Sequence, residues 1–205
     1  MLIFTEKRIA ILAVPKTGTT ALEMALRPHA DIVFQRNRKH MPAARFRQKV
    51  APFLKDGFGI QAETIAVMRE PEDQLRSWYK YRQSDRRAGH ENSTAGMSFD
   101  QFIRDAISDN PPPHAGVGSQ YSFLCDAKGR LLVHHLFAYE QMHIMIDFLQ
   151  DRLGTKIELE RRNVSPQVDA PLSDEMRTKL TKARSAEFDL YAKLTSREGY
   201  LEGEI

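Results

Sequence analysis

The chain has 205 residues, of which 41% are hydrophobic and 28% are charged, and its formal net charge is +3. This length suits one domain over residues 1–205 with a sizeable core, and the composition is ordinary for a globular protein. The small positive charge suits an anionic ligand and does not require nucleic acid as a partner. Cys125 is the single cysteine, which excludes an intramolecular disulfide and a metal cluster of thiolates.

The first residues resemble neither a signal peptide nor a membrane anchor. Leu2 to Phe4 predicts a short edge strand, but the apolar stretch stops at Thr5 and polar residues continue to Arg8. No run of the chain approaches the ~18 apolar residues of a membrane span. The sequence therefore predicts a cytoplasmic protein without a membrane span, and it leaves the oligomeric state open.

The strongest pattern is an apolar strand followed closely by a helix. Residues 9–14 are six uninterrupted apolar residues, which predicts a strand buried on both faces, as in a parallel sheet covered by helices. Residues 21–26 contain good helix formers with an apolar stripe. The pattern predicts an α/β fold of three layers with a central, mainly parallel sheet.

The loop between this strand and helix has the sequence PKTGTT, from Pro15 to Thr20. The first amides of a helix lack intrahelical partners and carry partial positive charge, so they bind anions. Gly18 permits close approach of an oxyanion, Lys16 adds charge, and Thr19 and Thr20 add hydroxyl donors. The alternative is an ordinary turn facing water. The ATP-loop pattern G-x-x-x-x-G-K-[ST] is absent, which disfavours a standard nucleotide loop.

Residues 30–34 predict a second strand of the sheet, followed by a basic segment. Six lysines and arginines lie between residues 36 and 49. These cations form either a basic rim around the binding site, which would favour an acidic acceptor, or the solvated face of a helix that follows Pro42. We prefer the solvated face, because Phe46, Val50 and Phe53 give this helix an apolar side.

A second strand-to-helix pattern covers residues 64–82. Residues 64–68 predict a buried strand, Arg69 follows its end, and Pro71 suits the first turn of the next helix. Ser77 lies on that helix, eight residues after Arg69. The alternative role for Arg69 is a surface ion pair with Glu70 or Glu72.

The later elements are predicted from local signals. Ser98 and Gln101 form a capping box at the start of a helix, and Gly154 ends a helix that follows a strand over residues 131–139. Residues 157–159 predict a last short strand, and Ser173 caps a C-terminal helical region. Loops over residues 83–97 and 110–123 are expected to cover an acceptor.

These motifs resemble the sulfotransferases that use 3′-phosphoadenosine 5′-phosphosulfate (PAPS). PKTGTT is similar to their 5′-phosphosulfate loop, and R-E-P-E-D-Q-L-R-S-W-Y is similar to the segment whose Arg and Ser hold the 3′-phosphate. The resemblance implies a P-loop-like fold in which residues 16–20 hold the phosphosulfate and Arg69 and Ser77 hold the 3′-phosphate. Glu70 departs from the usual Asn. Asn163 to Pro166 resembles a turn found near the cofactor.

The resemblance also implies the catalytic groups. Lys16 and Thr17 lie in the loop, where Lys16 would neutralise charge on the bridging oxygen. Lys39-His40 resembles the Lys-His pair of the carbohydrate-type branch, in which the histidine is the base. His40 is alternatively a surface histidine or an acceptor-binding group, and Glu70 is a substitute candidate for the base. No metal is implied.

The expected function is therefore transfer of a sulfuryl group from PAPS to an acceptor hydroxyl, with a carbohydrate or another small molecule as the acceptor. Two alternatives remain open. One is a kinase for nucleotides or small molecules with an atypical loop. The other is a non-catalytic module that binds PAPS, an anionic glycan or a protein partner.

Overall fold

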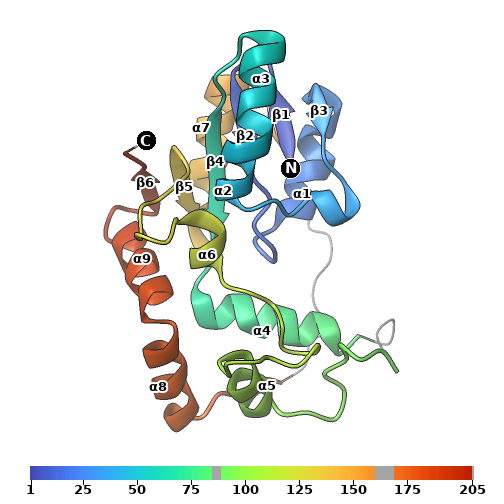
Figure 1. The fold of residues 1–205 in the computed structure, drawn as a ribbon, viewed down its shortest axis with the longest axis vertical. Helices are drawn as coiled ribbons and strands as arrows, with labels where there is room; N and C mark the ends of the chain where they lie inside the picture. The colour runs from blue at the N-terminus through green and yellow to red at the C-terminus, as the bar shows by residue number, and fades with distance from the viewer. Residues whose placement is uncertain (85–88, 160–168, 205) are drawn as a thin grey trace.

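The centre of the molecule is a six-stranded sheet with the strand order β3-β1-β2-β4-β5-β6. We describe it from a computed structural model that covers residues 1–84, 89–159 and 169–204. Its strands are β1 (Leu2–Phe4), β2 (Ile9–Ile11), β3 (Ile32–Val33), β4 (Glu63–Met68), β5 (His135–Ala138) and β6 (Tyr200–Glu202). Helices lie on both sides of this sheet (Figure 1). The predicted α/β class with a central sheet is confirmed.

The sheet is mixed, with a parallel centre. Strand β4 pairs in parallel with both β2 and β5, whereas β1 is antiparallel to β2 and to β3, and β6 is antiparallel to β5. Strands β2, β3, β4 and β5 therefore run in one direction, and β1 and β6 run in the other. This arrangement brings the carboxyl ends of β2, β4 and β5 to one edge, where open α/β sheets bind ligands.

The two faces of the sheet are covered by different helices. One face packs on α1 (Thr19–Leu26) and α7 (Met142–Leu153), and the other packs on α3 (Ala51–Phe58), α6 (Gln120–Leu124) and α9 (Ser185–Thr195). Side chains alternate along each strand, as in Ile9 and Ile11 on the first face and Ala10 and Leu12 on the second. Both faces are apolar, which explains why the strands read as continuous apolar runs.

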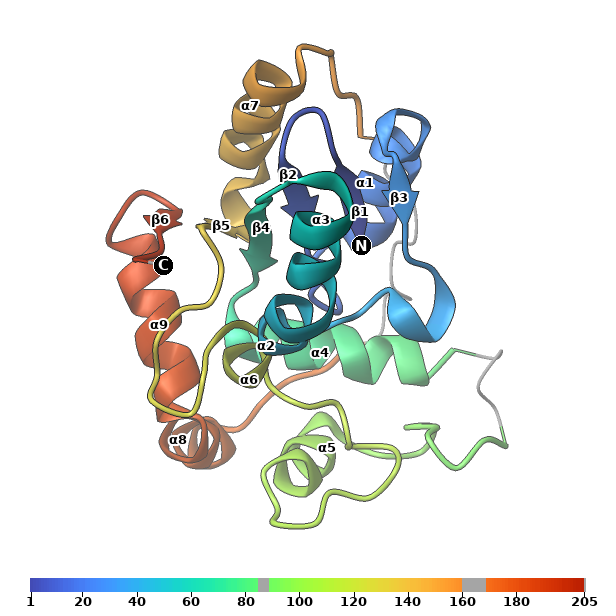
Figure 2. The same cartoon turned by 45° about the horizontal axis from the view of Figure 1, so that its top comes forward.

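A third cluster lies at the edge where β4 ends. Helix α4 (Pro71–Arg82) runs across this edge, with α5 (Phe99–Ala106) and α8 (Asp174–Ala183) beyond it (Figures 1 and 2). Leu75 and Tyr79 of α4 pack there with Phe102 and Leu180, all of them buried. One side of α4 thus belongs to this helical cluster and fixes the position of the helix over the end of the sheet.

Several edge predictions are wrong. Leu2 to Phe4 is an interior strand between β2 and β3 and not an edge strand. The strand predicted over residues 30–34 does form, but β3 has only two residues, lies at the edge of the sheet and pairs antiparallel with β1. Residues 157–159 form no strand, whereas β6 was not predicted. The predicted turn from Asn163 to Pro166 lies outside the described residues.

The helix after Pro42 also differs from its prediction. It starts as α2 (Ala43–Arg45), passes through a π-helical turn at Phe46–Val50 and continues as α3. A π-helical turn holds more residues than an α-helical turn, so it rotates the following side chains around the axis. Leu54 is therefore buried, whereas Phe53 is 54% exposed. Arg45, Arg47 and Lys49 lie on the exposed side, as expected for a solvated face.

The predicted helix ends are confirmed. Ser98 and Ser173 accept hydrogen bonds from the backbone N–H groups of Gln101 and Met176, and Gly154 ends α7 in the left-handed region. Within the described ranges, no helix is long and apolar enough to cross a bilayer.

Candidate functional site

The loop between β2 and α1 has a strained, fixed backbone. Lys16 has φ 67° and Gly18 has φ 73°, so both lie in the left-handed region, which costs a residue with a side chain about 1 kcal/mol or more. Thr17 is fully buried, and its hydroxyl donates to the carbonyl oxygen of Val14 at 2.9 Å. A Cβ atom on Gly18 would lie 3.1 Å from Cε2 of Tyr139, so this position is suited to glycine.

The first turn of α1 has no side-chain cap among the described residues. Helix α1 begins at Thr19, and the N–H groups of Ala21 and Leu22 donate to the carbonyl oxygen of Gly18 at 3.0 and 3.3 Å. In the part of the chain that the structure describes, no side chain caps this turn and no acidic residue lies in it. The N–H groups of Thr19 and Thr20 thus begin a helix without a side-chain cap, which is the arrangement that favours an anion.

Arg69 lies beside this loop at the end of the neighbouring strand. Its Nη1 is 3.5 Å from the carbonyl oxygen of Lys16, and its guanidinium lies 4.6 Å from the centre of the Tyr139 ring. Its Nε is buried and lacks a hydrogen-bond partner among the described residues. The ends of β2, β4 and β5 therefore meet at Gly18, Arg69 and Tyr139.

The Lys16 side chain lies against α4. Its ammonium is 4.3 Å from the ring centre of Tyr81 and 5.6 Å from that of Trp78, both distances suited to cation–π contact. Burial, together with the nearby charge of Arg69, lowers the pKa of Lys16 to about 8. The indole Nε1 of Trp78 is buried, and no described residue accepts a hydrogen bond from it. Lys16 is thus a desolvated cation beside a second cation.

Ser77 is buried one residue before Trp78 on α4. Among the described residues, no hydrogen bond joins Ser77 to Arg69 or to the loop. The structure therefore brings Lys16 and Arg69 together directly, and it places Ser77 on the helix that contacts Lys16.

His40 lies on the other side of the loop. Its Nδ1 is 2.7 Å from the carbonyl oxygen of Ala13, so Nδ1 carries the proton and Nε2 has the free lone pair. His40 as a residue is exposed, but desolvation of its ring lowers its pKa below the usual value; the hydrogen bond to Ala13 opposes this effect and the charge of Lys39 adds to it. Lys39 pairs with Glu23 of α1 at 2.7 Å. His40 is therefore neutral at pH 7, as a general base must be.

Glu70, the substitute candidate for the base, has a structural role. Its carboxylate accepts a hydrogen bond from the N–H of Asp73 at 2.6 Å and so caps α4. Burial raises the pKa of this carboxyl group. Its own N–H donates to Glu140, whose other oxygen accepts from Tyr191 at 2.7 Å.

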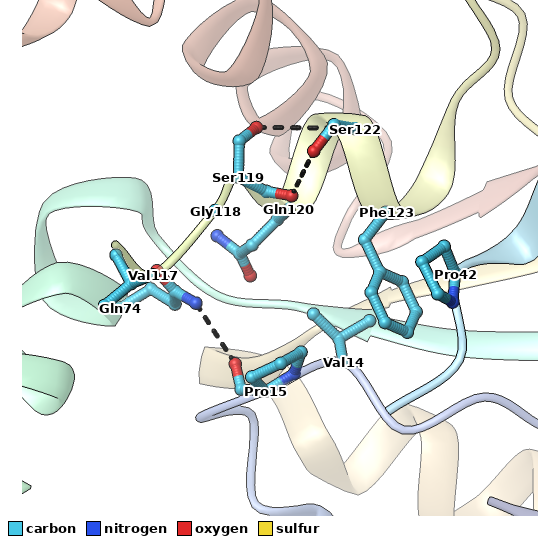
Figure 3. Close-up of a pocket in the computed structure, with 10 residues that line it drawn as sticks. All are labelled: Val14, Pro15, Pro42, Gln74, Val117, Gly118, Ser119, Gln120, Ser122 and Phe123. Atoms are coloured by element: carbon cyan, nitrogen blue, oxygen red, sulfur yellow. Dashed lines mark hydrogen bonds between the residues drawn. The ribbon is translucent and has the colours of Figure 1, made fainter. Parts of the chain in front are cut away.

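A pocket of about 180 Å³ lies between the loop and α6 (Figure 3). Val14 and Pro15 form one wall, and Gln74 of α4 lies at its side. The side-chain amide of Gln74 donates to the carbonyl oxygen of Pro15 at 3.2 Å, while its Oε1 is buried and lacks a partner among the described residues. Lys16 follows the lining residue Pro15, and His40 stands two residues before the lining residue Pro42, but neither of them lines the pocket itself.

Sequence reasoning missed the residues that support Arg69. Gln120 lies in the 110–123 segment that was expected to cover an acceptor and lines the adjoining pocket, but its side chain also binds both backbone groups of Arg69 and is itself held by the buried Glu187. Tyr139 was not singled out, although it follows the third parallel strand and its place at the binding edge was therefore predictable.

The site thus combines two cations, an uncapped helix start, a neutral histidine and a small adjoining pocket. Comparison with known proteins adds no relative: no family model matches the chain, and a search of curated proteins finds no significant match.

Proposed function

We propose that this chain is a sulfotransferase that moves a sulfuryl group from PAPS to an acceptor hydroxyl. The observation that carries the proposal is the contact between the two motifs, because Nη1 of Arg69 lies 3.5 Å from the carbonyl oxygen of Lys16. Fifty-three residues separate them in the sequence. A ligand with an anionic group at each end needs two neighbouring groups that bind anions, such as this loop and Arg69.

Unsatisfied polar atoms at the site support a bound polyanion. Buried polar groups normally have hydrogen-bond partners, and one left alone costs about 1–3 kcal/mol. Nε of Arg69 and Nε1 of Trp78 are buried donors without partners among the described residues. Both are donors, which fits an acceptor-rich ligand such as a phosphate or sulfate ester. The first-turn amides of α1 and the ammonium of Lys16 are also donors and favour the same kind of anionic ligand.

Different residues would hold the two ends of PAPS. The backbone of residues 17–20, with the hydroxyls of Thr19 and Thr20, would hold the 5′-phosphosulfate, and Arg69 and Ser77 would hold the 3′-phosphate. When bound, PAPS supplies a sulfuryl group whose bond to the bridging oxygen breaks as the acceptor oxygen bonds to sulfur, leaving 3′-phosphoadenosine 5′-phosphate. Lys16 stabilises the charge that develops on the departing oxygen.

His40 takes the proton of the acceptor hydroxyl. Its Nδ1–H is directed to the carbonyl oxygen of Ala13, which fixes the tautomer and leaves Nε2 as the proton acceptor. The lowered pKa of His40 keeps this nitrogen unprotonated at neutral pH. The ion pair between Lys39 and Glu23 anchors the segment to α1.

Two measurements test the proposal. Isothermal titration calorimetry should show that 3′-phosphoadenosine 5′-phosphate binds at least tenfold tighter than ATP with Mg²⁺, because ATP lacks the 3′-phosphate that Arg69 would hold. Transfer of radiolabelled sulfate from PAPS to a panel of alcohols, phenols and sugars should then give a labelled product. Tighter binding of ATP with Mg²⁺ would instead favour the kinase, and tight binding without transfer would favour a non-catalytic module.

A further inference from the structure

The pocket beside the loop is placed to receive the acceptor. Its walls come from the end of β2, from the segment before α2, from α4 and from the start of α6 (Figure 3). It is lined by Val14, Pro15, Pro42, Gln74, Val117, Gly118, Ser119, Gln120, Ser122 and Phe123. The residues on either side of it in the sequence include His40 and Lys16. His40 and residues 16–20 do not themselves line the pocket, so its link to the candidate base and the phosphosulfate loop rests on these neighbours in the sequence and on the contact of His40 with Ala13, next to Val14.

None of these ten lining residues, as the structure describes them, carries a charged side chain. An acceptor with a carboxylate or sulfate inside the pocket would lose its hydration without gaining a cation, which is costly. The arginines and lysine at positions 45, 47 and 49 lie on the exposed helix face, and Pro42 is the one lining residue from the whole basic segment. The pocket therefore favours an uncharged group.

One polar atom of the pocket still needs a partner. Ser119 Oγ accepts from the N–H of Ser122 at 3.3 Å, and Ser122 Oγ donates to the carbonyl oxygen of Ser119 at 2.9 Å. The amide of Gln120 is engaged with Arg69 and Glu187. Oε1 of Gln74 has no partner among the described residues, and Gln74 is only 2% exposed. Because this atom is an acceptor, a ligand that reaches it has to offer a hydrogen-bond donor.

The size of the pocket limits the ligand further. Pockets for drug-sized ligands usually measure about 300–1,000 Å³, whereas this one measures about 180 Å³. It has room inside for a single ring. The apolar side chains of Val14, Val117 and Phe123 suit the face of such a ring.

We propose that the acceptor enters this pocket as an uncharged ring with at least two hydroxyl groups. One hydroxyl donates to Oε1 of Gln74 and positions the ring. The other gives its proton to Nε2 of His40 while its oxygen bonds to sulfur and the bond between sulfur and the bridging oxygen breaks. This assignment of the acceptor rests on the proposed function. A monosaccharide and a dihydroxybenzene share this chemistry.

Binding of small probes tests the inference without any transfer. Dissociation constants would be measured by saturation-transfer NMR on the full chain, with and without 3′-phosphoadenosine 5′-phosphate. The aromatic arm compares resorcinol with 3,5-dihydroxybenzoate, which adds a charge, and with 1,3-dimethoxybenzene, which lacks the donors. The sugar arm compares methyl β-glucoside with methyl β-glucuronide. In at least one arm the uncharged hydroxyl compound should bind about tenfold tighter than its comparison compounds.

Two variants connect binding to this pocket. Ser122 is exposed at its lining, so Ser122→Phe should fill the pocket and weaken probe binding at least tenfold, while Ser122→Ala should change it less than twofold. Gln74→Met should remove the preference for resorcinol over 1,3-dimethoxybenzene. Both Ser122 variants should bind 3′-phosphoadenosine 5′-phosphate as the wild type does.

The outcomes separate the two proposals. Absence of binding by every hydroxyl probe, equal or tighter binding of the anionic compounds, or unchanged binding in Ser122→Phe would each overturn the pocket assignment, even if 3′-phosphoadenosine 5′-phosphate binds tightly. Failure of 3′-phosphoadenosine 5′-phosphate to bind, with the expected probe preferences, would overturn the sulfotransferase proposal and leave an uncharged-diol pocket.

Discussion

The side-chain amide of Gln120 binds both backbone hydrogen-bonding groups of Arg69. Its Oε1 accepts from the N–H of Arg69 at 2.9 Å, and its Nε2 donates to the carbonyl oxygen of Arg69 at 2.8 Å. Glu187 in turn accepts from the N–H of Gln120 at 3.0 Å and from Nε2 at 3.2 Å. Gln120 and Glu187 are 1% and 2% exposed. A buried series of hydrogen bonds that starts at Glu187 of α9 thus fixes the position of Arg69 where β4 ends.

Replacing Gln120 tests this support. Gln120→Ala removes the partner of two buried backbone groups, so we expect a loss of unfolding free energy of about 1–3 kcal/mol in urea denaturation. Because Arg69 loses its fixed position, affinity for 3′-phosphoadenosine 5′-phosphate should fall about tenfold in calorimetry. Gln48→Ala, at an exposed position on the π-helical turn, is the control and should change neither quantity. Equal behaviour of the two variants would contradict the positioning role.

The sequence predicts the strands and helices that have strong local patterns. Strands β2, β4 and β5 are covered on both faces, so each contains consecutive apolar residues, although β4 begins with Glu63 and β5 with His135. The helix caps at Ser98 and Ser173 depend on side-chain contacts three residues away, which a local pattern also contains. The position of the two candidate anion-binding motifs can likewise be predicted, because each follows a predicted strand.

The rest depends on contacts that no local pattern encodes. Gln120 lies 51 residues from Arg69 and 67 from Glu187, and nothing near it in the sequence indicates either partner. Strand β6 has only three residues, and its antiparallel pairing with β5 holds it in the sheet. The exposure of Phe53 follows from the π-helical turn before it, which an expected period of 3.6 residues does not include.

Gly18 should tolerate no side chain. Gly18→Ala forces a left-handed φ of 73° on a residue with a Cβ atom and places that atom 3.1 Å from the Tyr139 ring. We expect a loss of stability of about 1–2 kcal/mol and a loss of anion binding. Gly57→Ala is the matched control, since a Cβ there meets nothing within 4 Å and the position is inside α3. It should raise stability by up to about 1 kcal/mol in the same denaturation assay.

The lowered pKa of Lys16 makes anion binding depend on pH. A bound polyanion favours the charged ammonium, so binding raises the pKa of Lys16 from about 8 and takes up protons. Affinity for 3′-phosphoadenosine 5′-phosphate should therefore be highest below pH 7 and fall about tenfold between pH 7 and pH 9. Calorimetry in buffers with different ionisation enthalpies should show about half a proton taken up at pH 8.

Lys16→Arg is the control for this pH dependence, because a guanidinium stays charged over the whole range. Its affinity should be nearly constant from pH 7 to pH 9. A wild-type affinity that does not change over this range would show that Lys16 does not bind the anion.

Lys16 should also lower the stability of the fold. Its folded-state pKa of about 8 is below the ordinary value of 10.5, so the unfolded chain binds the proton more tightly. The destabilisation is therefore complete below pH 8 and disappears as the pH rises toward 10.5. Lys16→Met should raise the unfolding free energy at pH 7 by about 1 kcal/mol while transfer falls about 10²-fold or more. A variant that is both less stable and fully active would contradict this assignment.

His40 should determine how the rate of transfer falls at acid pH. Because desolvation of its ring lowers its pKa below 6.5, the imidazole remains neutral at pH 7, and the rate of transfer should decline with falling pH only in the acid range below pH 6.5. His40→Ala should lower turnover about 10²–10⁴-fold with nearly unchanged affinity for 3′-phosphoadenosine 5′-phosphate. His29→Ala, at an exposed position after α1, should have normal turnover. Full turnover in His40→Ala, or the same acid decline in that variant, would show that another group accepts the proton.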